Sequence, residues 1–210
     1  MIRMHSAPAR LARAALFLAI LIAPVAPALA GDSLSIGATM PSADQMLLGV
    51  DGSKLSLGEV RGEKGTLVVF TCNTCPWVKA WDERIAALGN EYSERGIGVV
   101  SINSNDPNVN KGDSLDAMKE RAAKLGLRFP YVVDGTSGLA QEFGATRTPE
   151  AFLFDASGQL AYHGTIDDNA RNPGQVEKTF LKDALEAVAN GQPVAVAETK
   201  ALGCGIKFRN

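Results

Sequence analysis

The stretch TLVVFTCNTCPWVKAW (residues 66–81) contains an apolar run, two cysteines separated by two residues, and the start of a helical pattern. The run TLVVF predicts a strand that is buried on both faces of a sheet. After Pro76, apolar residues recur at steps of three and four from Val78 to Tyr92, which is typical of a helix with one buried face. Cys72 is therefore predicted to lie where a buried strand gives way to a helix.

The rest of the chain alternates between short β-branched runs and amphipathic segments. Gly158 is expected in the turn of a hairpin between the last two strands. The order βαβαβαββα predicts an α/β fold with a mixed central sheet and helices on both faces. Beyond the opening stretch, the predicted strands are 97–102, 129–133, 151–155 and 160–164, and the predicted helices are 115–125, 137–144 and about 173–190.

The N-terminal segment has the composition of a targeting sequence. Residues 1–30 combine three arginines, an apolar core and a final ALA, which is typical of a secretory signal peptide cut before Gly31. The alternative is a retained membrane anchor. Pro24 and Pro27 interrupt the apolar run, however, and about 20 apolar residues are needed to span a bilayer.

We expect residues 31–210 to form a single domain, with a C-terminal tail from about residue 192, in the periplasm or outside the cell. The whole chain has 21 basic and 23 acidic residues, and losing the three arginines of the leader leaves 18 basic residues and a net charge of −5. This mildly acidic balance argues against nucleic acid or a membrane surface as the main partner.

Three kinds of site use two cysteines at this spacing. A zinc site would need further ligands, and only Cys204 and His163 remain after residue 31. A structural disulfide gains little stability from such a short loop. A redox pair is favoured, because the amide groups and the dipole at the start of a helix stabilise a thiolate, here predicted at Cys72.

Thr148 and Pro149 directly precede the strand at 151–155, where a proline indicates either a strand entry or an ordinary loop. A strand, a CxxC that opens a helix, and a later Thr–Pro ahead of a hairpin together resemble the thioredoxin fold. That resemblance implies that the Thr148–Pro149 bond is cis, faces the cysteines and helps to hold the backbone of a substrate.

The resemblance extends over residues 36–208. IGATMP (36–41), INSND (102–106) and GCGIKF (203–208) resemble the redoxins related to alkyl hydroperoxide reductase and thiol-specific antioxidant proteins, and more narrowly a peroxiredoxin-like subgroup of exported thioredoxin-family proteins. One departure is important. Peroxiredoxins carry a proline and a threonine or serine seven and three positions before the reactive cysteine, and for Cys75 these positions hold Val68 and Cys72.

The predicted function is an exported thiol–disulfide oxidoreductase in which Cys72 attacks and Cys75 resolves the mixed disulfide. Its partners would be a protein or small-molecule disulfide and a thiol electron donor or acceptor. Trp77 and Asn103 are predicted beside the substrate, although Trp77 has the alternative of packing on Trp81 one turn later. No cofactor and no metal are predicted.

Two other functions remain open. One is a thiol peroxidase that uses Cys75. The other is a Cu(I) chaperone that uses Cys72, Cys75 and His163, since thiolates suit Cu(I). His163 lies in an alternating strand pattern, which favours a histidine on the surface of the hairpin over a ligand.

Cys204 lies between two glycines in the tail. It is interpreted either as a third redox thiol or as a small buried residue of a docked tail. The second interpretation is favoured, because a CxxC pair already contains its own resolving thiol.

Overall fold

The computed structural model describes Met1 and residues 33–209, so the predicted signal peptide lies outside the described residues. A seven-stranded mixed sheet has the order β2-β1-β5-β4-β3-β7-β8, with β3, β4 and β5 parallel to one another. Strands β1, β7 and β8 pair antiparallel with their neighbours. The strands are β1 (Leu47–Gly49), β2 (Lys54–Leu55), β3 (Gly65–Thr71), β4 (Ile97–Asn103), β5 (Tyr131–Val133), β7 (Glu150–Asp155) and β8 (Leu160–Gly164).

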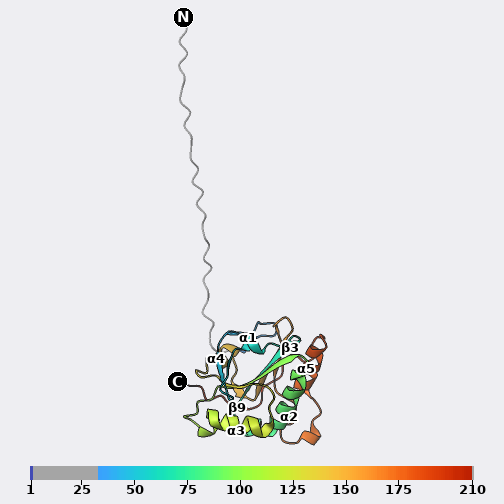
Figure 1. Ribbon diagram of the computed structural model, residues 1–210. Helices are drawn as coiled ribbons and strands as arrows, with labels where there is room; N and C mark the ends of the chain where they lie inside the picture. Colours follow the sequence, from blue (N-terminus) through green and yellow to red (C-terminus); the bar gives the residue numbers. More distant parts are fainter. Residues whose placement is uncertain (2–32, 210) are drawn as a thin grey trace.

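Helices cover both faces of this sheet, as predicted (Figure 1). Alternate side chains of β3 point to opposite faces, so Leu67 and Val69 pack with α2 and α5, while Val68 and Phe70 pack with α1 and α4. All four side chains are at most 1% exposed, and burying such a side chain stabilises a fold by about 1.5–3 kcal/mol. The helices are α1 (Leu57–Val60), α2 (Pro76–Ser93), α3 (Leu115–Leu125), α4 (Gly138–Phe143) and α5 (Phe180–Ala189).

A second, two-stranded sheet joins the C-terminal tail to the rest of the protein. Strand β6 (Arg147–Thr148) pairs antiparallel with β9 (Cys204–Gly205), and Thr148 lies opposite Cys204. Strand β9 is more than fifty residues away in sequence from β6, with which it pairs. The alternation of Ile206 and Phe208 suggests from sequence that the tail pairs or packs as a short strand, whereas β6 has no such pattern.

The last helix begins later than predicted. A helix was expected from about residue 173, but Pro173–Gln175 forms a short 3₁₀ turn and α5 begins at Phe180. Side chains compete with helix formation in between, because Asn172 accepts a hydrogen bond from Gly174 N at 3.1 Å and Asp168 accepts one from Glu177 N at 3.1 Å.

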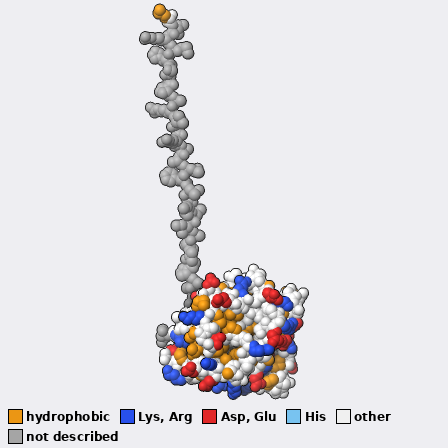
Figure 2. Space-filling model, viewed as in Figure 1, with side chains coloured by type: hydrophobic (Ala, Val, Ile, Leu, Met, Phe, Trp, Pro, Cys, Tyr) orange, Lys and Arg blue, Asp and Glu red, His pale blue; other side chains and the backbone are white. Residues whose placement is uncertain are grey.

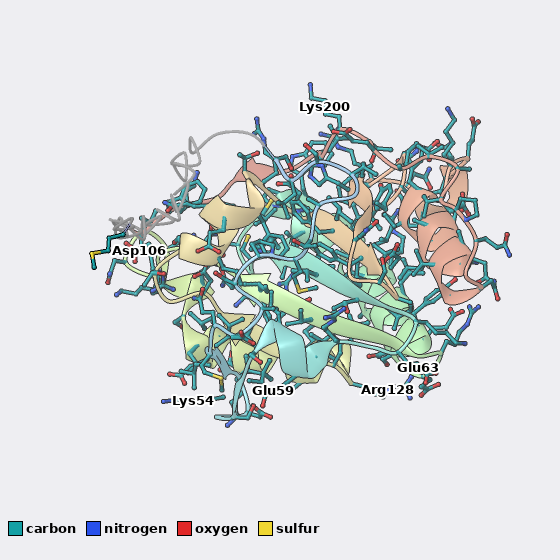
Figure 3. The ribbon with its side chains drawn as sticks, turned by 90° about the horizontal axis from the view of Figure 1, so that it is seen from above. Lys54, Glu59, Glu63, Asp106, Arg128 and Lys200 are labelled. Carbon is teal, nitrogen blue, oxygen red and sulfur yellow. The ribbon has the colours of Figure 1, made fainter. Side chains whose placement is uncertain are left out.

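The surface is mixed in charge. On the face shown in Figure 2, basic and acidic side chains alternate around apolar patches without forming a continuous basic region. Figure 3 shows Glu59, Glu63 and Arg128 at one edge of the molecule and Lys200 at the opposite edge, all directed outward. Within residues 33–209, no helix is long and apolar enough to cross a membrane.

Candidate active site

Cys72 and Cys75 lie in the turn between β3 and α2. Helix α2 begins at Pro76, whose missing N–H costs little at the first helical position, and Cys75 is the N-cap residue. The two cysteines are 1% and 3% exposed, and they form a small cluster with Val78, against which Trp77 and Cys204 pack. The buried strand and the helix start therefore hold the two thiols together.

Thr148 contacts both thiols. Its Oγ1 lies 3.2 Å from Cys72 Sγ, and its carbonyl oxygen lies 3.2 Å from Cys75 Sγ. The Thr148–Pro149 peptide bond is cis. The structure thus brings Thr148 and Pro149 to the cysteines, as the resemblance implied.

Cys204 also lies at this site. Its Sγ is 2.6 Å from Cys75 Sγ, and all three cysteines are free thiols in the structure. The interpretation of Cys204 as a small apolar residue of the tail does not account for this contact.

The three thiols differ in acidity. Hydrogen bonds from Cys72, from Cys204 and from the backbone N–H of Val78 lower the pKa of Cys75 to about 4, against the opposing effect of burial. The pKa of Cys72 is raised above its ordinary value, by its hydrogen bond to Cys75 and by burial. Of the two paired thiols, the lowered pKa favours Cys75 as the thiolate, because Cys75 caps α2, whereas the sequence predicts the thiolate at Cys72.

A titration checks this. Because its pKa is lowered, Cys75 should stay a thiolate from neutral pH down to about pH 4, so alkylation by iodoacetamide should slow only below that value. The ultraviolet absorbance of the thiolate should follow the same curve. Cys75→Ser should abolish the transition, and Cys204→Ala should move it upward because a hydrogen-bond donor is lost. A single transition near the ordinary thiol value would contradict this reading.

A buried carboxylate holds the loop between the cysteines. Asp113 is 2% exposed and accepts hydrogen bonds from Asn73 N at 2.7 Å, Thr74 Oγ1 at 2.7 Å and Asn105 Nδ2 at 3.0 Å. The next residue, Ser114, caps α3 and accepts a hydrogen bond from Ala117 N. Asp113 thus fixes the two residues that separate Cys72 from Cys75.

A second buried acid, Glu150, positions β6, the strand that ends at the cis Thr148–Pro149 bond. Glu150 accepts hydrogen bonds from Thr146 N and Arg147 N, both at 2.9 Å. Its other oxygen lies 2.7 Å from His163 Nε2. His163 is 7% exposed and stacks on Phe152, so its predicted place on the surface of the hairpin is wrong.

The two other predicted substrate residues have different surroundings. Trp77 does both things that the sequence offered as alternatives, because it packs beside the thiols and lies 6.0 Å from the ring of Trp81. Asn103 is buried at the end of β4, where its side chain donates to Asp113 O at 3.4 Å and accepts from Asn105 N at 3.0 Å. Its bonds are to the Asp113 loop and not to a thiol.

Metal binding has little support in the residues that the structure describes. Among them, no three His, Cys, Asp or Glu side chains are arranged to hold an ion. His163, the histidine required by the copper alternative, is bonded to Glu150.

Comparison with known proteins agrees with the geometry. A sequence profile of the Redoxin family matches residues 35–180. The chain is 24% identical over 156 residues to the thiol-disulfide oxidoreductase ResA of Geobacillus thermodenitrificans, covering 74% of this chain and 79% of that protein. It is 25% identical over 111 residues to ResA of Halalkalibacterium halodurans, covering 53% of this chain but only 58% of that protein.

Solved structures share the fold. An uncharacterized conserved protein from Geobacillus kaustophilus is 33% identical, with a TM-score of 0.79 over 88% of this chain and 97% of that one. A thioredoxin-like protein in its oxidized form is 20% identical, with a TM-score of 0.56 over 75% of this chain and 97% of that one. The predicted thioredoxin-like fold is confirmed.

Proposed function

Since this chain belongs to the Redoxin family, we propose that it is an exported thiol–disulfide oxidoreductase that exchanges electrons through Cys72 and Cys75. The observation that carries the proposal is the pair of thiols at the start of α2, both of which contact Thr148 beside its cis bond to Pro149. The curated relatives named thiol-disulfide oxidoreductases support the same reaction class. Export is proposed from the composition of residues 1–30.

The reaction needs two thiols and no added group. The Cys75 thiolate attacks one sulfur of a substrate disulfide, a Cys75–substrate bond forms, and the substrate's other sulfur leaves as a thiolate. Cys72 then loses its proton and attacks Cys75 Sγ, which releases the second substrate thiolate and closes the Cys72–Cys75 bond. One substrate disulfide is reduced to two thiols, and the protein is oxidised by two electrons.

The partner would be a disulfide of a protein or a small molecule, and an external thiol would restore the reduced protein. The direction in which the cycle runs depends on the reduction potential of the Cys72–Cys75 bond relative to those partners. Trp77, beside the thiols, offers an apolar contact for either partner.

A stoichiometric test uses the reduced full-length protein and oxidised glutathione as the probe. We expect one disulfide to be reduced per chain, with the appearance of a Cys72–Cys75 bond, and no reaction of the double variant Cys72→Ser/Cys75→Ser. Unreacted wild-type thiols in a large excess of the probe, with the fold intact by circular dichroism, would refute the proposal.

Hydrogen peroxide serves as a parallel probe for the alternative reaction. The lowered pKa of Cys75 is what a peroxidase also needs, but Val68 and Cys72 occupy the positions where peroxiredoxins carry their proline and hydroxyl residue. We therefore expect slow oxidation by peroxide. Oxidation of Cys75 by peroxide much faster than by oxidised glutathione would favour the peroxidase.

A further inference from the structure

The C-terminal tail is built into the site by backbone contacts. Ile206 N donates to Thr146 O at 3.0 Å, Asp106 N donates to Lys207 O at 2.7 Å, and Lys207 N donates to Asn105 Oδ1 at 2.8 Å. The side chain of Ile206 is 7% exposed and packs in the core. These backbone contacts, together with the pairing of Cys204 with Thr148, fix the backbone of the tail at the site. The position of Cys204 therefore does not depend on the rotamer of its side chain alone.

Gly203 lets the tail come this close. A Cβ atom at this position would overlap the backbone carbonyl of Thr148, whereas a Cβ at Gly205 would meet no atom within 4 Å. Only glycine at 203 therefore permits β9 to lie against β6 at the level of the thiols. This contrast provides a matched pair of substitutions.

Cys204 differs from the other two thiols in its access to solvent. Cys72 and Cys75 are buried, whereas Cys204 is half-buried. Its sulfur lies 2.6 Å from that of Cys75, and a disulfide needs about 2.05 Å, so a small movement is enough to join them. An external thiol would meet Cys204 before it met either buried sulfur.

We propose that Cys204 is a third redox thiol, which takes over the disulfide from the buried pair by bonding to Cys75 and presents it to external thiols. The proposal rests on the proposed function, and it adds the route by which the pair is reduced again.

The transfer is an isomerisation without net oxidation. Starting from the Cys72–Cys75 disulfide, Cys204 attacks Cys75 Sγ as a thiolate, the Cys75–Cys204 bond forms, and Cys72 leaves and takes up the proton that Cys204 gave up. An external dithiol then attacks Cys204 Sγ and Cys75 leaves as a thiolate. The second thiol of the donor then attacks the donor's mixed disulfide with Cys204 and releases the Cys204 thiolate. The donor is left as a disulfide, oxidised by two electrons, and the protein is fully reduced.

The acidity of the thiols agrees with this order. Burial and the hydrogen bond and charge of Cys75 raise the pKa of Cys204 to about 11. The two contributions from Cys75 vanish once that sulfur is in a disulfide, which makes Cys204 a better nucleophile at that stage. In the last step Cys75, with its lowered pKa, is the better leaving group of the two sulfurs.

Disulfide mapping tests the bond directly. Trypsin places Cys72 and Cys75 on one peptide, 65–79, and Cys204 on another, 201–207, so a Cys75–Cys204 bond joins two peptides that are otherwise separate. After oxidation with diamide and alkylation in acid, we expect Cys72→Ser to give the joined peptides as its main product. Wild type should give both the joined peptides and the Cys72–Cys75 loop, and Cys204→Ser should give the loop alone.

Kinetics test the route with the matched glycines. Reduction of the oxidised protein by dithiothreitol should be about tenfold slower or more in Cys204→Ser and in Gly203→Ala, and within about twofold of wild type in Gly205→Ala. Circular dichroism shows whether each variant is folded. The tryptic peptide 65–79 with an internal Cys72–Cys75 bond shows whether its buried pair is oxidised.

Two results would overturn the proposal: no joined peptides from oxidised Cys72→Ser, or reduction of Cys204→Ser at the wild-type rate. Failure of the proposed function is a different result, because wild type would then not reduce oxidised glutathione, whatever bond the mapping finds.

Discussion

Replacing Cys75 by serine should slow attack on a disulfide by on the order of a thousandfold or more, because it removes the thiol whose pKa is lowered. Cys72→Ser should keep the attack. Its adduct on Cys75 should then pass to Cys204, which is 2.6 Å away. The measurement is the rate at which each reduced variant releases thiol from a chromogenic aromatic disulfide in a single turnover.

This expectation reverses the roles that the sequence suggests. Loss of attack in Cys72→Ser, with attack retained in Cys75→Ser, would return the nucleophile to Cys72. The matched control is Cys204→Ala, in which the attacking sulfur of Cys75 remains but loses one hydrogen-bond donor. Its attack should be slower than wild type yet far faster than that of Cys75→Ser.

The sequence predicted the sheet well where the signal was local. The run TLVVF became the centre of β3, and the apolar steps from Val78 to Tyr92 became the buried face of α2. Hydrophobic periodicity reports burial, and burial is what decides these elements. Strands β6 and β9 have two residues each, too short to show which strand each pairs with, so the pairing of β6 with β9 could not be predicted from the chain.

The assignment of the thiolate depended on one boundary. The motif lies between strand and helix, but whether the helix caps at Cys72 or at Cys75 decides which sulfur meets the amide groups. Pro76 at the first helical position favours Cys75. Proline at this position is a known start signal, and more weight on it would have moved the predicted thiolate to the second cysteine.

The residues that support the site were not visible because they are distant in sequence. Asp113 is about forty positions from the loop that it binds, and Glu150 meets His163 across the paired strands β7 and β8. Nothing in the composition around either acid separates it from a surface carboxylate. Cys204 was visible as a residue, but only the pairing of β9 with β6 brings it to Cys75.

The largest expected loss of stability is from Asp113→Ala. The substitution leaves Asn73 N, Thr74 Oγ1 and Asn105 Nδ2 without the acceptor that they share, and Asp113 is only 2% exposed. An unpaired buried donor costs about 1–3 kcal/mol, and solvent will reach part of the opened space, so we expect the free energy of unfolding to fall by about 3 kcal/mol. Urea unfolding at neutral pH, followed by circular dichroism, measures the change.

The control is Asp116→Ala, which removes an exposed acid from the first turn of α3, three residues away in the sequence. It should shift the urea midpoint far less than Asp113→Ala, since surface substitutions away from buried contacts have small effects. Asp113→Ala should also slow closure of the Cys72–Cys75 bond, because Asn73 and Thr74 lose the group that holds them in place. Equal midpoints for the two variants would show that the loop between the cysteines does not depend on the Asp113 carboxylate, and that its order comes from the packing of β3 and α2 alone.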